Sequence, residues 1–362
     1  MFNKVDKGYF TKKLLLWNGK ENDRPMPWKG EKDPYKIWLS EIILQQTRVE
    51  QGWAYYNRFV ATFSDVKKLA KAPEEKIFKL WEGLGYYTRC KNLIATAKFI
   101  ANEKQGIFPN TYEDILSLKG IGPYTAAAIG SFAFNLPHAV VDGNVFRVLS
   151  RFFGIDTATD STAGKKLFTE LAEDLLDKKQ PGIYNQAIMD FGAVICKPQN
   201  PLCTHCPLKS KCVAFKQDKV ELLPVKAGKM IKKARWFYYF IVEHNGKIYV
   251  RKRGPKKIWE NLYEFLLFES ERMLPVEEIE QTDFFKSMIG KNKFTVLHVS
   301  KMYKQQLTHQ TIHGCFIQLS IKKEPFLKDY KLVTSKEFIK LPFPKFITGF
   351  LAENELKAFE QI

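Results

Sequence analysis

A short turn with two glycines separates two helical patterns near the middle of the chain. Gly120 and Gly122 flank the apolar Ile121, and Pro123 stands where many helices begin. Glycine lets the backbone reverse tightly and leaves amide N–H groups exposed, where they bind phosphate oxygens without reading a base sequence. The segment therefore predicts either a phosphate-binding hairpin between two helices or an ordinary turn between two core helices.

The balance of charge indicates an anionic partner. Lysine and arginine number 57 against 39 aspartates and glutamates, which gives a formal net charge of +18. Such an excess favours nucleic acid, although charge alone does not exclude a ribosomal or membrane surface. Hydrophobic residues make up 45% of the 362 positions, so the chain fills real cores and is not a disordered basic tail.

Signals for membrane insertion or export are not evident in the sequence. No run of about 18 apolar residues occurs, and the first residues lack the apolar stretch of a signal peptide. We therefore expect a cytoplasmic, nucleoid-associated protein that does not bind a membrane.

Most of the cysteines crowd into one short segment. Four of the six fall within seventeen residues with the spacing C-x6-C-x2-C-x5-C, at Cys196, Cys203, Cys206 and Cys212. Clustered thiols in a chain without an export signal indicate a metal site rather than disulfides. From the spacing alone, zinc and an iron–sulfur cluster fit about equally well, and His205 is a weaker candidate ligand.

The sequence divides into a helical part and a mixed part. Helical patterns fill residues 8 to about 215, whereas 217–235 has little periodicity and many lysines. Beyond it, 236–243 and 248–251 are aromatic and β-branched and flank a turn at Asn245-Gly246. We therefore predict an all-α domain over 1–216, a basic linker over 217–235 and an α+β domain over 236–362.

One carboxylate lies on an apolar helical face. The helix that we predict from Asp33-Pro34 onward carries Glu41 one turn after Ile37 and one turn before Leu44. Loss of water around such a carboxyl raises its pKa and makes it a candidate general acid near neutral pH. A buried glutamate satisfied by a partner, or a helix turned to expose it, is the alternative.

A second carboxylate has a different setting. Asp142 follows the apolar run 139–141 and precedes a helix predicted from about Val145 through Phe153. Amides and the dipole at a helix N-terminus favour the ionised form, so we expect Asp142 to stay negative where Glu41 tends to be protonated. Such a pair breaks glycosidic bonds, one group protonating the leaving group and the other stabilising a cationic sugar. A plain N-cap is the alternative.

In combination, these motifs resemble the helix-hairpin-helix base-excision DNA glycosylases, and among them the adenine DNA glycosylases of the MutY type. The matching segments span most of residues 24–212 and are 38–47, 83–87, 120–125, 141–144, 185–192 and the four-cysteine loop 196–212. The resemblance implies a first domain with a six-helix part and an iron–sulfur part, the four cysteines holding a [4Fe-4S] cluster. It also implies a Nudix-like second domain.

The resemblance further implies a role for each residue. Glu41 protonates nitrogen 7 of adenine, and Asp142 stabilises the oxocarbenium-like sugar or briefly bonds to it, with Tyr124 and Asn144 in support. Residues at the DNA or the base are Arg24, Gln46, Thr47, Leu84, Tyr86, Gly120 and Gly122. Core packing is the alternative for Leu84 and Tyr86.

Position 124 separates the subfamilies. Relatives with lyase activity carry a lysine two residues after the second hairpin glycine, and here that residue is Tyr124, which cannot form a Schiff base. We therefore expect an enzyme that removes adenine opposite 8-oxoguanine or guanine in duplex DNA and leaves the strand uncut. We also expect it to be a monomer. An endonuclease III-like lyase is disfavoured by Tyr124, and a noncatalytic iron–sulfur DNA-binding protein by the presence of both Glu41 and Asp142.

The second domain resembles the domain with which this family checks the opposite strand for 8-oxoguanine. The catalytic box of Nudix hydrolases is missing from the sequence, so we expect binding rather than pyrophosphate hydrolysis. The family commonly carries Phe-Ser-His in its recognition loop, where Leu307, Thr308 and His309 stand here. A hydroxyl and an imidazole remain but the aromatic ring does not, and His313 competes with His309 for the role. Lys29 also stands where an arginine is usual.

Overall fold

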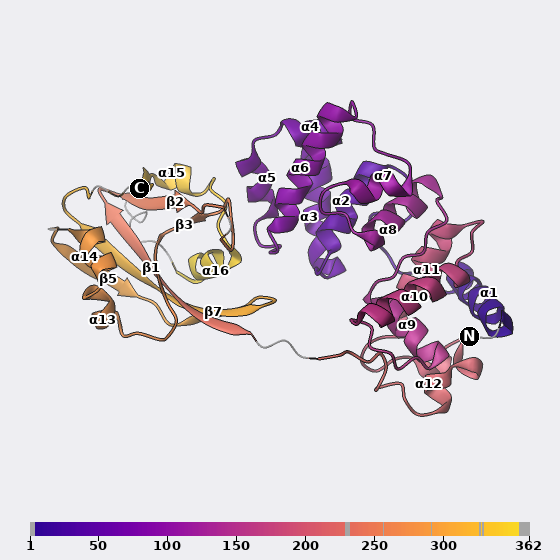
Figure 1. Ribbon diagram of the computed structural model, residues 1–362. Coiled ribbons are helices and arrows are strands. Elements are labelled where there is room, and N and C mark those ends of the chain that lie inside the picture. The colour runs from indigo at the N-terminus through magenta and orange to yellow at the C-terminus, as the bar shows by residue number, and fades with distance from the viewer. Residues whose placement is uncertain are drawn as a thin grey trace. The chain divides into compact units, whose positions relative to one another are not determined.

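The computed structural model describes residues 4–228, 232–255, 257–290, 292–325, 327 and 329–354 (Figure 1). These residues form two compact units. One combines the chain up to Lys71 with Asn92–Gly228, and the other combines Ala72–Lys91 with the described residues from 232 onward. Residues 229–231 of the predicted linker and 355–362 of the predicted second domain lie outside the described residues.

The regular elements described in the first unit are helices, as the sequence predicts. They are α1 (Lys4–Lys20), α2 (Pro34–Leu44), α3 (Val49–Thr62), α4 (Val66–Lys71), α6 (Thr88–Glu103), which begins in the other unit, α7 (Tyr112–Ser117), α8 (Pro123–Phe134), α9 (Gly143–Phe153), α10 (Thr162–Leu175), α11 (Pro181–Val194) and α12 (Val213–Lys216). Two short 3₁₀ helices, η1 (Cys203–His205) and η2 (Lys209–Lys211), lie in the cysteine loop.

Helices α1, α8, α9, α10 and α11 enclose one apolar core. The ring of Phe10 on α1 lies 4.9 Å from that of Phe152 on α9, and Trp17 meets Phe191 on α11 edge to face at 5.0 Å. Burying a side chain of this size contributes about 1.5–3 kcal/mol. The core therefore holds α9 and α11 in place, and Met189 on α11 belongs both to this core and to the lining of the pocket described below.

The glycine turn between α7 and α8 has the predicted form. Gly120 has a φ of 82°, and Gly122 precedes α8, whose first residue is Pro123. A Cβ at Gly120 would also lie 2.7 Å from the side chain of Asn92 on α6. Both the left-handed backbone and the close packing thus require glycine at position 120.

Part of the segment that we predict as a linker packs on the first unit. The backbone oxygen of Leu223 accepts from Arg151, and that of Val225 accepts from the amide of Thr159. Leu223 is buried. The boundaries at residues 216 and 236 stay predictions.

The second unit contains a mixed sheet with helices on both faces. Its strands are β1 (Lys233–His244), β2 (Lys247–Lys252), β3 (Tyr263–Glu264), β4 (Leu266–Ser270), β5 (Phe294–Val299), β6 (Tyr303–Gln306), β7 (Gln310–Ile321) and β8 (Lys331–Val333). Its helices are α5 (Glu74–Trp81), α13 (Val276–Glu280), α14 (Asp283–Ile289), α15 (Ser335–Phe338) and α16 (Lys345–Glu353).

Strands β1 and β7 are parallel at the centre, and the other described pairings are antiparallel. The predicted turn at Asn245-Gly246 joins β1 to β2, with left-handed φ values of 50° and 69°. Alternation along β1 sends Tyr238 and Phe240 toward α14, whereas Tyr239 stacks on Phe316 on the face covered by α16. The predicted α+β character is confirmed.

Candidate active site

Glu41 lies in a buried position on α2. The helix begins as predicted, with Asp33 accepting a hydrogen bond from the Tyr35 amide at 2.9 Å and Pro34 as its first residue. The Glu41 side chain is only 6% exposed because α2 packs against α8. Burial raises the pKa of Glu41 to about 7, an effect to which the charge of Asp142 adds and which a hydrogen bond from Tyr124 opposes.

The glycine turn brings Tyr124 to this carboxyl. Tyr124 is the second residue of α8, and its hydroxyl donates a hydrogen bond to Glu41. The same oxygen lies 3.6 Å from the sulfur of Met189 on α11. Position 124, where related lyases carry the lysine, therefore faces the predicted acid in this chain.

Asp142 lies at the start of a helix, as predicted, and caps α9, which the sequence analysis gave as the alternative role, but its pKa moves opposite to our expectation. Its carboxylate accepts from the Val145 amide and from the Asn144 side chain, each at 2.8 Å. Burial raises the pKa of Asp142, and the hydrogen bonds from Val145 and Asn144 and the charge of Arg147 only partly oppose this. We expected the helix N-terminus to dominate, whereas loss of water around the carboxyl outweighs it.

A buried arginine that the sequence analysis missed braces Asn144. Arg147 donates to the Asn144 side-chain oxygen at 2.7 Å, to the backbone oxygen of Gly192 at 2.7 Å and to that of Cys196 at 2.8 Å. A Cβ at Gly192 would lie 2.6 Å from the Asn144 Cβ, so glycine permits this approach. The sequence gives little signal for this role, because Arg147 lies with Asn144, Ser150 and Arg151 on the polar face of the helix after Asp142.

These side chains share one pocket of about 180 Å³. It is lined by Arg24, Met26, Trp28, Glu41, Leu44, Thr47, Val49, Tyr124, Asp142, Asn144, Gln186 and Met189. An adjoining opening beside Glu41, Tyr124 and Asp142 is lined further by Gln45, Gln46 and Gly143. The structure thus brings Arg24, Gln46 and Thr47 to the predicted catalytic residues.

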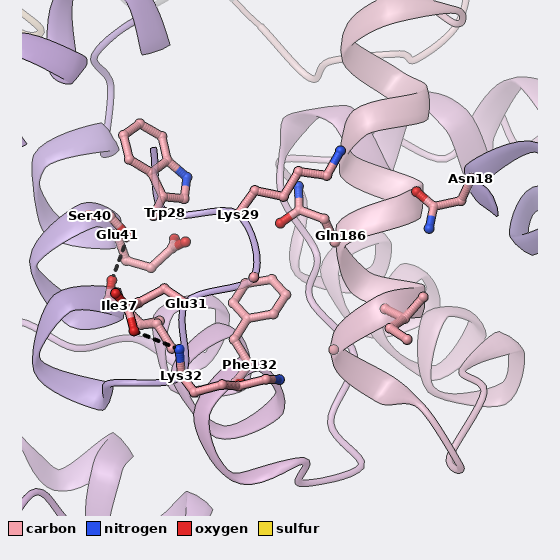
Figure 2. A pocket seen from close by; sticks show the side chains of 13 residues that line it. Asn18, Trp28, Lys29, Glu31, Lys32, Ile37, Ser40, Glu41, Phe132 and Gln186 are labelled. Atoms are coloured by element: carbon pink, nitrogen blue, oxygen red, sulfur yellow. Dashed lines mark hydrogen bonds between the residues drawn. The ribbon is translucent and has the colours of Figure 1, made fainter. Parts of the chain in front are cut away.

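A second cavity of about 230 Å³ shares Trp28, Glu41 and Gln186 with the first (Figure 2). Figure 2 shows the Glu41 side chain reaching from α2 into the space between Trp28 and Gln186. Lys29 also lines this cavity, with its ammonium 3.4 Å from the buried carboxylate of Asp190. Arg24 binds the same carboxylate at 2.8 Å, so one buried aspartate orients both cations.

The four clustered cysteines lie in the loop after α11, and none is in a disulfide. The thiol of Cys206 interacts electrostatically with those of Cys196, Cys203 and Cys212. Arg151 on α9 lies 3.6 Å from the Cys196 sulfur, and its backbone oxygen accepts from Cys212 at 3.4 Å. Among the described residues, no group of three or more His, Cys, Asp or Glu side chains has an arrangement that could hold a metal ion.

The second unit holds the DNA-contact candidates Leu84, Tyr86, Leu307, Thr308 and His309. Leu84 is buried, with 6% exposure, whereas Tyr86 is 46% exposed and has a left-handed φ of 49°. Thr308 and His309 are exposed at the tip of the β6–β7 hairpin, which the Leu307 amide closes by donating to the Gln310 oxygen at 2.8 Å.

His313, the rival of His309, stacks on a ring within the sheet. It lies on β7, with its imidazole 5.3 Å from the ring of Trp236 on β1 and nearly parallel to it. His313 follows His309 by four residues and lies within β7, so it is separate from the hairpin tip at Thr308 and His309.

The raised pKa of Glu41 predicts a pH-dependent cost in stability. Below pH 4.5 the carboxyl is protonated in the folded and unfolded chains, and between 4.5 and about 7 it ionises only on unfolding, so stability falls as pH rises. Replacing Glu41 with Gln removes this cost. We expect the free energy of unfolding of the variant, relative to the unaltered chain, to increase by about 3 kcal/mol between pH 4.5 and 8.

Urea denaturation across this pH range measures the difference. Glu113→Gln, which removes an exposed carboxylate from α7, is the matched control and should give a difference that does not change with pH. If the difference in the free energy of unfolding between Glu41→Gln and the unaltered chain were also independent of pH, it would contradict the burial of an ionisable Glu41.

Two protein-family models match separate parts of this chain. Residues 39–174 match the HhH-GPD superfamily of base excision DNA repair proteins, and residues 237–353 match the NUDIX domain. No helix among the described residues is long and apolar enough to cross a membrane.

Similar proteins cover most of the chain. The adenine DNA glycosylase of Buchnera aphidicola subsp. Baizongia pistaciae is 36% identical over 87% of this chain and 87% of its own length. That of Mus musculus is 40% identical over 58% of this chain and 42% of its own. The structure of a thermostable thymine-DNA glycosylase superposes with a TM-score of 0.55 at 30% identity, over 59% of this chain and 98% of that one. The chain belongs to the adenine DNA glycosylase family, enzymes of base excision repair that hydrolyse N-glycosyl bonds.

Proposed function

We propose that this enzyme removes adenine mispaired with 8-oxoguanine or guanine from duplex DNA and leaves the sugar–phosphate strand intact. The observation that carries the proposal is the shared pocket, which a buried acid, Glu41, lines together with Tyr124 and with the helix-capping carboxylate of Asp142. Two carboxyl groups in unlike surroundings are what cleavage of a glycosidic bond requires. The size and lining of the pocket suit a single base that has left the duplex.

The lining supports a flat heteroaromatic ligand. Trp28 offers a ring face, and Leu44, Val49 and Met189 add apolar surface, whereas Gln186 supplies hydrogen-bonding groups. An enzyme that acts on a base inside a duplex must first extrude it, and extrusion costs least when the base is mispaired. The pocket would receive adenine after that step.

Glu41 supplies the proton. With a pKa near 7, a substantial fraction of the carboxyl is protonated at neutral pH and donates to nitrogen 7 of adenine as the glycosidic bond breaks. Adenine then leaves as a neutral base. The Tyr124 hydroxyl, hydrogen-bonded to Glu41, orients the carboxyl toward the base.

Asp142 stabilises the positive charge that the departing base leaves on the sugar. The Val145 amide and the Asn144 side chain hold its carboxylate in place, and Arg147 braces Asn144 in turn. Water then adds to the sugar and completes hydrolysis. Because Tyr124 has no amine, no covalent Schiff base forms, and the abasic site remains in an uncut strand.

Duplex DNA, bound by one copy of the chain, is the proposed partner. The backbone around Gly120 and Gly122 offers amides to a phosphate beside the pocket, and the net charge of +18 favours the polyanion. The exposed Thr308 and His309 at the β6–β7 hairpin tip are the groups proposed to read the opposite base.

The four cysteines are proposed to hold a [4Fe-4S] cluster. Their thiols interact with one another, none is bridged, and the backbone turns of η1 and η2 set Cys203, Cys206 and Cys212 in one compact loop. Thiolates are the usual ligands of such clusters. When bound, the cluster would cross-link this loop, which Arg147 and Arg151 already tie to α9.

We expect Glu41→Gln to abolish adenine release while duplex binding persists, because the amide cannot donate the required proton. The test incubates a duplex carrying adenine opposite 8-oxoguanine with each protein, and analyses the strand before and after hot alkali. The unaltered chain and the control Glu113→Gln should give cleavage only after alkali. Cleavage without alkali would indicate a lyase, and near-normal excision by Glu41→Gln would exclude it as the acid.

We expect the purified chain to be brown, with broad absorbance near 400 nm and about four irons per chain. Replacing Cys206, whose thiol interacts with the other three, with Ser should lower the iron content, whereas Cys315→Ser, which removes a buried cysteine of the other unit, should not. A colourless protein with one zinc per chain would contradict the cluster.

We expect Thr308→Ala combined with His309→Ala to reduce the preference for 8-oxoguanine over guanine without stopping excision. A base contact of this kind contributes about 1–3 kcal/mol of discrimination. The ratio of single-turnover excision rates on the two duplexes measures the effect. The matched control is Thr295→Ala with His298→Ala, an exposed pair on β5, near the other end of β7. An unchanged ratio in the hairpin variant would contradict the assignment.

A further inference from the structure

Helix α5 and the loop after it pack within the second unit through several polar contacts. The Tyr263 hydroxyl on β3 donates to Glu75 at 2.6 Å, and Lys91 pairs with Glu260 at 2.6 Å. Lys79 donates to the backbone oxygen of Leu341 at 3.0 Å. The segment 72–91 is thus held along its length by residues far away in the sequence.

One residue of the α15–α16 connection binds both ends of the loop 83–86. The Phe343 amide donates to the Glu82 carboxylate at 2.7 Å, and the Phe343 carbonyl accepts from the Tyr87 hydroxyl at 3.4 Å. Phe343 is itself buried, and its ring lies 4.7 Å from that of Phe338 and 5.8 Å from that of Phe265. Its peptide groups are therefore a rigid support for the loop.

The loop has a backbone that needs such support. Gly83 and Gly85 have φ values of 93° and 76°, and Tyr86, which is not a glycine, has a φ of 49°. A left-handed tyrosine is strained and persists only where its surroundings hold it. Trp81 donates to the Gly85 oxygen at 3.0 Å, and the Arg89 guanidinium lies 5.5 Å from the Tyr86 ring, which remains exposed.

We propose that Phe343 positions the loop 83–86, so that the second domain helps to extrude adenine in addition to reading the opposite base. The inference rests on the proposed function, and on the expectation from the sequence that the exposed Tyr86 contacts the DNA. A side chain that wedges between bases acts only if its backbone does not yield on contact. The two peptide groups of Phe343 supply that resistance at the two points where the loop begins and ends.

The test compares two substitutions at Glu82 in the full-length enzyme. Glu82→Ala removes the acceptor of the Phe343 amide and also the ion pair that Glu82 forms with Lys79 at 2.8 Å. Glu82→Gln loses the ion pair too, but it keeps an oxygen in the same place and should restore the contact with Phe343 alone. The probe is a duplex with 2-aminopurine opposite 8-oxoguanine, whose fluorescence rises on extrusion. We expect Glu82→Ala to weaken extrusion and single-turnover excision of paired adenine about fivefold, as for one lost hydrogen bond, and Glu82→Gln to remain close to the unaltered enzyme.

Two controls separate loop positioning from a general loss of packing. Glu75→Ala removes the partner of Tyr263 at the far end of α5 and should leave extrusion unchanged. An adenine opposite an abasic analogue has no pairing partner, so its extrusion costs less free energy. On that substrate the loss of excision rate caused by Glu82→Ala should be smaller. Tyr87→Phe, which deletes only one hydroxyl, should show a smaller loss of the same kind.

Normal extrusion by Glu82→Ala, or an equal loss in Glu75→Ala, would overturn the proposed role of Phe343 while leaving the proposed function intact. Failure of the unaltered enzyme to excise adenine opposite 8-oxoguanine would instead contradict the proposed function and, with it, this inference. The alkali assay on the unaltered enzyme therefore precedes the comparison of variants.

Discussion

The burial of one carboxyl group, Glu41, is the constraint around which the first unit is organised. Packing of α2 on α8 removes water from this group and raises its pKa to about 7, a cost that the folded chain bears near neutral pH. The surrounding apolar core contributes enough free energy to offset it. The same burial that weakens the fold makes a proton available at the base of the pocket.

Helix α9 connects that pocket to the cysteine loop. Its first turn holds Asp142 and Asn144, while Arg147 and Arg151, one turn apart, bind backbone oxygens of residues 192 and 196–198. Both arginines are buried and hydrogen-bonded, so their charges are satisfied by carbonyl groups rather than by water. A shift of the cysteine loop would therefore be felt at Asn144, and through it at Asp142.

The second unit presents two different loops from one aromatic core. The β6–β7 hairpin carries Thr308 and His309 at an exposed tip, and Phe343 supports the loop of Tyr86. Rings packed on both faces of β1 and β7 make this sheet stiff, since close-packed aromatic side chains transmit displacement rather than absorb it. The two proposed tasks, reading a base and supporting a wedge, thus share one scaffold.

Local chemistry along the chain was enough to predict the cap at Asp33, the helix start after Asp142, the tight glycine turn at Gly120 and the β1–β2 hairpin, because each depends on residues a few positions apart. The apolar stripe likewise predicted the burial of Glu41. Only the tertiary structure decided the rest. The pKa of Asp142 rises because distant helices exclude water from it, Arg147 finds its partners on α11 and in the cysteine loop, and the loop of Tyr86 meets Phe343 some 260 positions away. Such contacts follow from packing, and packing leaves no periodic trace in a sequence.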